Sequence, residues 1–311
     1  MSWAAGARAT PHRYSLSSLN WIEFSPAGPG AAPSPPAVAG LREVFDAAVF
    51  TGFEFVGIDL ASTRSCFPDE TTHTALAAAL KTRGLACSDV GILFIGVPWT
   101  DDHARALAAL ANELDAPTCL ATFAGPVTDE SIGQLRRSAA LLCEAGARIA
   151  LEYMPVGQLR NITDASAICA EIGWERCGLL LDSYHVCRAG STHQQLSGLS
   201  AEQISLVQLA DGDVPLRESP GVDARRHRLP AGYGNLAIPE FVSQLHALGW
   251  AGTISPEVLS EGLLAVGPRL GAALLHASAR LAWEATAQMP SAAAGFPQQG
   301  VTAAPGRRQP I

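Results

Sequence analysis

Charged residues are scarce in this chain, at 16% of its 311 residues, and no apolar run is long enough to cross a membrane. A membrane-spanning helix needs about 18 or more uninterrupted apolar residues. The N-terminal stretch MSWAAGARATPHRY also lacks the continuous apolar segment of a secretory signal. Hydrophobic residues make up 48% of the chain, which is enough to bury a large core and argues against wholesale disorder. We therefore expect a cytoplasmic protein with no membrane partner.

Basic residues are too few for a nucleic-acid partner, because the net charge is −8 and such binders carry a basic face. The only dense basic run is Arg225, Arg226, His227 and Arg228. Seven cysteines are present, an odd number with no CxxC pair, so we expect reduced thiols and no disulfide framework.

Three segments differ in composition from the rest of the chain. Residues 1–12 are expected to be a flexible terminus, and residues 288–311 a disordered tail. Residues 25–37, SPAGPGAAPSPPA, are too rich in proline and glycine for a regular element and predict an insertion. Residues 13–287 remain as one folded domain.

Within that domain, short apolar runs alternate with amphipathic ones such as GLREVFDAAVFTG and THTALAAALKTRG, whose final glycines predict helix ends. Strands are expected at residues 14–19, 54–59, 87–93, 118–123, 147–153, 177–182, 204–210 and 252–258. Eight strand–helix units predict an α/β fold, a single (β/α)₈ TIM barrel. An open doubly wound sheet is the alternative, although no GxGxxG motif follows the first strand.

Oxygen-bearing side chains mark the ends of four successive predicted strands: Glu152, Asp182, Gln208 and Glu257, with His185 three residues beyond Asp182. In a barrel the active site lies at the C-terminal ends of the strands, so these residues would converge. Each has an ordinary alternative, such as a loop acid, a helix cap for Asp182 or a packed histidine. Together, three carboxylates and one amide suit one divalent metal ion, Mn²⁺ or Mg²⁺, with Co²⁺ as a further candidate.

The chain resembles the xylose isomerase-like barrels, often labelled sugar phosphate isomerase/epimerase, over residues 38 to 287. The resemblance rests on GFEFVGIDL, ALEYMP, LLLDSYH, VQLAD and the stretch RLPAGYGNLAIPEFVSQLHALGWAGTISPEV. It implies that the metal ligands are Glu152, Asp182, Gln208 and Glu257, that His185 lies beside the metal, and that Arg228 holds a substrate oxygen. Many relatives have histidine at the position of Gln208, and Tyr233 replaces an acid of the glycine segment.

The resemblance implies an isomerase or epimerase acting on a small polyhydroxylated carbonyl substrate, in which Glu152 and Glu257 serve as base and acid. A dehydratase of the 3-dehydroshikimate or inosose type is the alternative, since the spacing of the four expected ligands, with Gln208 as the third, resembles that of the bacterial 3-dehydroshikimate dehydratases. An endonuclease-like barrel and a barrel without catalysis are less favoured alternatives. We expect Trp21, after the first strand, to contact the substrate, and a homo-oligomer is compatible with the resemblance.

Overall fold

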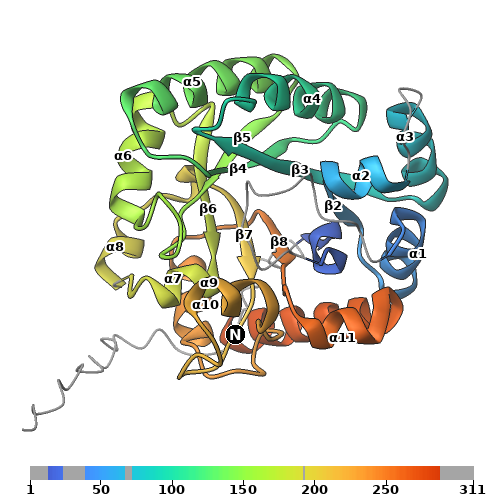
Figure 1. Ribbon diagram of the computed structural model, residues 1–311. Coiled ribbons are helices and arrows are strands. Elements are labelled where there is room, and N and C mark those ends of the chain that lie inside the picture. The colour runs from blue at the N-terminus through green and yellow to red at the C-terminus, as the bar shows by residue number, and fades with distance from the viewer. Residues whose placement is uncertain (1–12, 24–38, 67–71, 192, 288–311) are drawn as a thin grey trace, which may run out of the picture.

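Eight parallel strands close into a barrel in the order β1 to β8 (Figure 1). The computed structural model describes residues 13–23, 39–66, 72–191 and 193–287. The strands are β1 (Arg13–Ser17), β2 (Phe55–Asp59), β3 (Ala86–Ile95), β4 (Thr118–Phe123), β5 (Arg148–Glu152), β6 (Cys177–Asp182), β7 (Ile204–Leu209) and β8 (Thr253–Pro256). The predicted (β/α)₈ barrel is confirmed, and the open sheet is excluded because β1 pairs with β8.

A layer of helices surrounds the barrel (Figure 1). They are α1 (Leu41–Thr51), α2 (Leu60–Cys66), α3 (Thr72–Arg83), α4 (Thr100–Glu113), α5 (Asp129–Glu144), α6 (Ile162–Ile172), α7 (Ser183–Arg188), α8 (His193–Ser197), α9 (Pro220–Arg226), α10 (Ile238–Ala247) and α11 (Glu261–Ala287). The two glycines predicted to end helices do so: Gly52 and Gly84 have φ of 86° and 69°, a region that side chains avoid. Helix α11 is interrupted at Gly267 and packs against α1 and α10.

The interior of the barrel is apolar on one side and polar on the other. Leu120, Ala150, Leu180 and Leu206, from β4 to β7, form a small buried cluster of their own. Across from them, Ser15 and Ser88 join their hydroxyls at 2.5 Å, and Ser88 donates to Asp89. Gly57 gives this carboxylate its space, since a Cβ there would lie 2.6 Å from Asp89 Oδ1.

Five predicted strands are longer than the observed ones, and the differences at the first and the eighth lie next to residues of the predicted site. The first was expected over 14–19, but β1 ends at Ser17, whose hydroxyl accepts from the Leu19 amide and starts the 3₁₀ helix η1 (Ser18–Trp21). The eighth was expected over 252–258, but β8 ends at Pro256, so Glu257 lies just past it. Residues 1–12, 25–37 and 288–311 lie outside the described residues. Among the helices that the structure describes, none has the length and apolar character needed to span a membrane.

Candidate metal centre

The strand ends of one half of the barrel carry the residues expected to form a site. Glu152 is the last residue of β5 and Asp182 the last of β6. Asp182 pairs in register with Gln208 of β7, which in turn pairs with Ser255 of β8. Because side chains paired in parallel register point to the same face of a sheet, the pleat directs these groups to one place above the apolar cluster.

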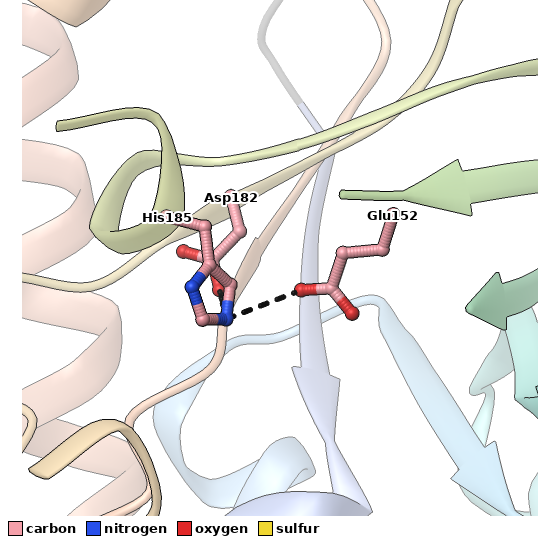
Figure 2. A group of neighbouring side chains, drawn as sticks. All are labelled: Glu152, Asp182 and His185. Carbon is pink, nitrogen blue, oxygen red and sulfur yellow. Dashed lines mark ion pairs between the residues drawn. The ribbon is translucent and has the colours of Figure 1, made fainter. Parts of the chain in front are cut away.

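Glu152, Asp182 and His185 form the tightest group (Figure 2). His185 Nε2 lies 3.7 Å from Glu152 Oε1 and 3.8 Å from Asp182 Oδ2, and one potential ligand atom from each residue falls within 4.8 Å of the others. The imidazole reaches them from α7, the helix that Asp182 itself begins by accepting from the Tyr184 amide at 2.9 Å. Asp182 is thus a helix cap through Oδ1 and still offers Oδ2 to the site.

Arg228 joins this group to the eighth strand. Its Nη1 donates to Asp182 Oδ2 at 2.7 Å and to the Glu257 carbonyl at 3.2 Å, and it lies 3.8 Å from Glu257 Oε2. Its Nη2 lies 3.1 Å from His185 Nε2. One buried guanidinium therefore contacts residues of three different elements, and it is the positive charge among three carboxylates.

Gln208 and Glu257 face each other across β7 and β8. The Gln208 Nε2 donates to Glu257 Oε1 at 2.8 Å. The other atom of the same amide, Gln208 Oε1, is buried and accepts no hydrogen bond from the described residues. A buried polar atom without a partner is costly, and such an atom calls for a ligand, an ion or a water molecule.

Burial sets the protonation of the acids at this site. It raises the pKa of Glu257 to about 7, with Arg228 opposing the shift and Asp182 adding to it. Burial also raises the pKa of Glu152 well above its usual value, and the charges of Asp182 and Glu257 act in the same direction. The pKa of His185 falls to about 3, because burial disfavours the imidazolium, so the ring is neutral. The neutral imidazole is the form that binds metal, and a bound cation would in turn favour the ionised forms of Glu152 and Glu257.

The residues present fit a divalent cation. Two buried acids, Asp182 and Glu257, and the partly exposed Glu152 lie near one guanidinium, an excess of acidic groups that proteins resolve by protonation or by a cation. The unpartnered Gln208 Oε1 supplies a further neutral oxygen donor beside Glu257. A set dominated by carboxylate and amide oxygens favours Mg²⁺ or Mn²⁺, and the nearby imidazole also admits softer ions such as Co²⁺ or Zn²⁺.

Tyr184, Asp223 and Asp211 support the site through contacts that the sequence does not reveal, although Tyr184 and Asp211 lie in the motifs LLLDSYH and VQLAD. Tyr184 donates to Asp223 at 2.6 Å, and Asp223 belongs to α9, whose Ala224 carbonyl accepts from Arg228 Nε. Asp211 holds the glycine segment, because its carboxylate accepts from the amides of four residues: Gly212, Gly232, Gly234 and Leu236. Tyr233 consequently stands at the tip of that segment, 63% exposed.

The structure does not bring Trp21 to this group. Its indole is 1% exposed and belongs to the hydrophobic core, where it lies against α11 near Gly271. The prediction that Trp21 contacts substrate is corrected for that reason. The 3₁₀ turn that ends β1 early directs this side chain into the helix layer. The neighbouring Asn20 instead faces β8, with its amide donating to the Pro256 carbonyl and accepting from the Val258 amide.

A curated relative matches part of the chain. It is a 3-dehydroshikimate dehydratase from Pseudomonas aeruginosa, 29% identical over 140 residues. The match spans 44% of this chain and 22% of the relative, so this chain covers less than a quarter of that protein's length.

Solved structures share the whole barrel. One is the IolI protein with a bound zinc atom, with a TM-score of 0.75 and 14% identity over 89% of this chain and all of that one. Another is an L-ribulose 3-epimerase, with a TM-score of 0.64 and 16% identity over 89% of this chain and 96% of that one. At these identities the likeness shows the fold alone.

The model of one protein family covers most of the barrel. It is described as the xylose isomerase-like TIM barrel and matches residues 45–282, which include every strand from β2 to β8 and all the site residues discussed above. The closed eight-stranded barrel agrees with that match. The chain belongs to the xylose isomerase-like TIM barrel family.

Proposed function

We propose that this protein is a divalent-metal-dependent isomerase or epimerase that removes a proton next to the carbonyl of a small sugar or polyol ketone. One observation carries the proposal: four side chains gather near the buried Arg228 at the C-terminal ends of β5, β6 and β8. Asp182, His185 and Glu257 are buried, and Glu152 is 12% exposed. Active sites of this fold lie at that end of the barrel. Acids that lie close together and have raised pKa values are typical of acid–base sites.

Glu152, Asp182, Gln208 and Glu257 are the residues that would hold the metal. All four bring oxygen, and Gln208 Oε1 has no other partner among the described residues. A divalent ion bound there would act as a Lewis acid toward a substrate carbonyl.

Glu257 and Glu152 would transfer the protons. A general base works best when its pKa is near the working pH, and in the metal-free protein burial raises the pKa of Glu257 to about 7. A bound cation would favour its ionised form, which is the form that accepts a proton. Glu152 has its pKa raised too, so it can carry the proton that the substrate regains. Glu152 approaches from β5 and Glu257 from β8, with Gln208 fixing the Glu257 carboxylate at 2.8 Å.

Arg228 and His185 would bind substrate oxygens. The guanidinium keeps its charge, because Asp182, Glu257 and Glu152 raise its pKa although burial opposes them. His185 is neutral at physiological pH, since burial lowers its pKa to about 3, and it can therefore donate or accept one hydrogen bond without carrying charge. Together they would orient a hydroxyl beside the carbonyl.

A dehydratase is the second candidate. The matching 140 residues of the curated 3-dehydroshikimate dehydratase favour it. Proton removal next to a ketone is shared with an epimerase, and the two reactions diverge only in whether a β-hydroxyl leaves. The same residues of this chain would perform the first step of either.

Incubation in deuterated water tests the shared step. The metal-loaded protein is mixed separately with ketoses, inososes and 3-dehydroshikimate, and proton NMR follows loss of the signal next to the carbonyl. Exchange with an epimeric or isomeric product supports the first candidate. An ultraviolet-absorbing conjugated product identifies the second, and no exchange with any compound of the panel, with metal bound, contradicts both.

A further inference from the structure

Three strongly exposed apolar side chains lie together on the wall formed by α1 and α11. Phe50 is 61% exposed, Leu270 67% and Leu281 69%. Among the large apolar side chains of the described residues, only Tyr233, on the glycine segment, is exposed to a similar degree. We call Phe50, Leu270, Ala273, Ala277 and Leu281 the α1/α11 patch.

The patch is continuous. Leu270, Ala273, Ala277 and Leu281 are three or four residues apart, so they share one face of α11. The opposite face buries Ala272, Leu275, Ala279 and Trp283. Phe50 stands beside this stripe, because α1 packs against α11 (Figure 1), and with Ala273, Ala277 and Leu281 it lines a groove of about 500 Å³.

The size of the patch fits an interface. The largest apolar patch of a typical monomer is about 300–600 Å², and such patches are often functional. A protein interface of standard size buries about 800 Å² on each partner, and the interfaces of homodimers are about 65% apolar. Three large side chains that are each more than 60% exposed, together with two exposed alanines, provide apolar area of that order on one helix pair.

The charges around the patch are complementary to those of a second copy. Arg269 lies near one end, with its guanidinium 3.9 Å from the centre of the Phe50 ring, and Glu284 lies near the other, beside Arg280. A two-fold axis near Ala273 and Ala277 would set the two α11 helices antiparallel and bring Arg269 toward the partner's Glu284. The small residues at the axis would let the two helices approach closely.

We propose that the α1/α11 patch is the two-fold interface of a homodimer in which α11 packs antiparallel to the partner's α11. Two-fold dimers are the commonest closed assembly, and each needs one self-complementary surface. An acidic membrane surface is the less favoured occupant, because the chain carries a net charge of −8 and the patch has charges of both signs at its edge. The interface is separate from the metal site, whose residues lie at the strand ends.

Sedimentation velocity of the full chain tests the interface. The wild type is expected to be a dimer at micromolar concentrations. Leu281→Glu, which places a charge in the apolar stripe of each copy, should weaken dimerisation about 30-fold or more. The matched control is Val127→Glu, which adds the same charge at an exposed valine outside the patch and should leave the dimer unchanged. Circular dichroism and metal content show that each variant is folded.

A charge exchange tests the antiparallel arrangement. Glu284→Arg should weaken the dimer, and adding Arg269→Glu should restore it, because the pair re-forms with its signs reversed. A wild type that is monomeric at all concentrations, or a Leu281→Glu variant as dimeric as the wild type, would overturn the proposal. So would a monomeric wild type that cosediments with vesicles of phosphatidylcholine and phosphatidylglycerol. Failure of the double variant to dimerise would refute the antiparallel arrangement.

Discussion

Arg228 and Asp182 form a buried ion pair with 2.7 Å between Nη1 and Oδ2, and their side chains are 4% and 0% exposed. The same guanidinium lies within 3.8 Å of Glu257 and hydrogen-bonds with His185. Through these contacts Arg228 links the end of β6, helix α7 and the residue that follows β8. In the metal-free protein, Arg228 is the cation that offsets the three carboxylates.

Arg228→Met should destabilise the metal-free protein by about 3 kcal/mol, because removing one partner of a buried pair leaves an uncompensated charge. Part of this loss should return when Mn²⁺ is added, since a cation that binds the folded state stabilises it. Urea unfolding in EDTA and in Mn²⁺ measures both effects. The control is Arg105→Met, whose ion pair with Asp102 is exposed and should contribute less than about 1 kcal/mol. An equal change in the two variants would contradict a special role for Arg228.

Elemental analysis of the purified protein should find about one divalent ion per chain after dialysis against Mn²⁺, and none in the Glu152→Ala, Asp182→Ala double variant. Both residues contribute oxygens to the group that falls within 4.8 Å. A suitable control is Asp59→Asn, at the end of β2, where the carboxylate already accepts from Ser18 and Ser62. Metal retained by the double variant would show that other residues of the chain bind it.

The elements of the barrel could be predicted from sequence because short apolar runs alternate with amphipathic ones, and three of the strands, β2, β5 and β6, end at an acid. Asp182 shows this well: it follows CGLLL, and the structure places it as the last residue of β6. The convergence of the acids also follows from topology, since parallel strands present their C-terminal ends at one mouth. Such reasoning needs only the order of elements along the chain.

The sequence could not reveal contacts that depend on small backbone irregularities. Trp21 points into the helix layer because β1 gives way to a 3₁₀ turn two residues earlier than its apolar pattern predicts. Asp89 lies inside the barrel because the register between β2 and β3 shifts, so Gly57 pairs with Asp89 although Val56 pairs with Cys87. The alternation of apolar and polar residues in the sequence does not show where the pairing of two strands skips one residue.

Glu257→Gln should abolish exchange of the substrate proton while leaving the fold intact. The glutamine keeps the volume of the side chain but cannot take up a proton, and a positioned general base is worth about 100-fold to 10,000-fold in rate. Deuterium exchange followed by NMR, with circular dichroism beside it, measures both properties. Glu261→Gln, a nearby exposed acid paired with Arg226, should exchange at the wild-type rate. A fully active Glu257→Gln variant would remove Glu257 from the proton transfer.

Asp89→Asn should stabilise the metal-free protein at pH 8 and have little effect at pH 4. Burial raises the pKa of Asp89 to about 6 from 3.8, and the hydrogen bond from Ser88 offsets only part of that shift. Between pH 3.8 and about pH 6 the folded state holds a proton that the unfolded state has released. Folding stability therefore falls as the pH rises through this window. Above pH 6 the full cost of burying the ionised carboxylate is present, about 3 kcal/mol for a pKa raised from 3.8 to about 6. Asparagine can still accept from Ser88 and carries no charge, so the variant should avoid most of this cost.

Urea unfolding of wild type and variant in EDTA at pH 4 and pH 8 measures the difference between their free energies of unfolding, which should widen as the pH rises. A difference that stays constant or reverses would place Asp89 in a far better solvated environment than the barrel interior provides.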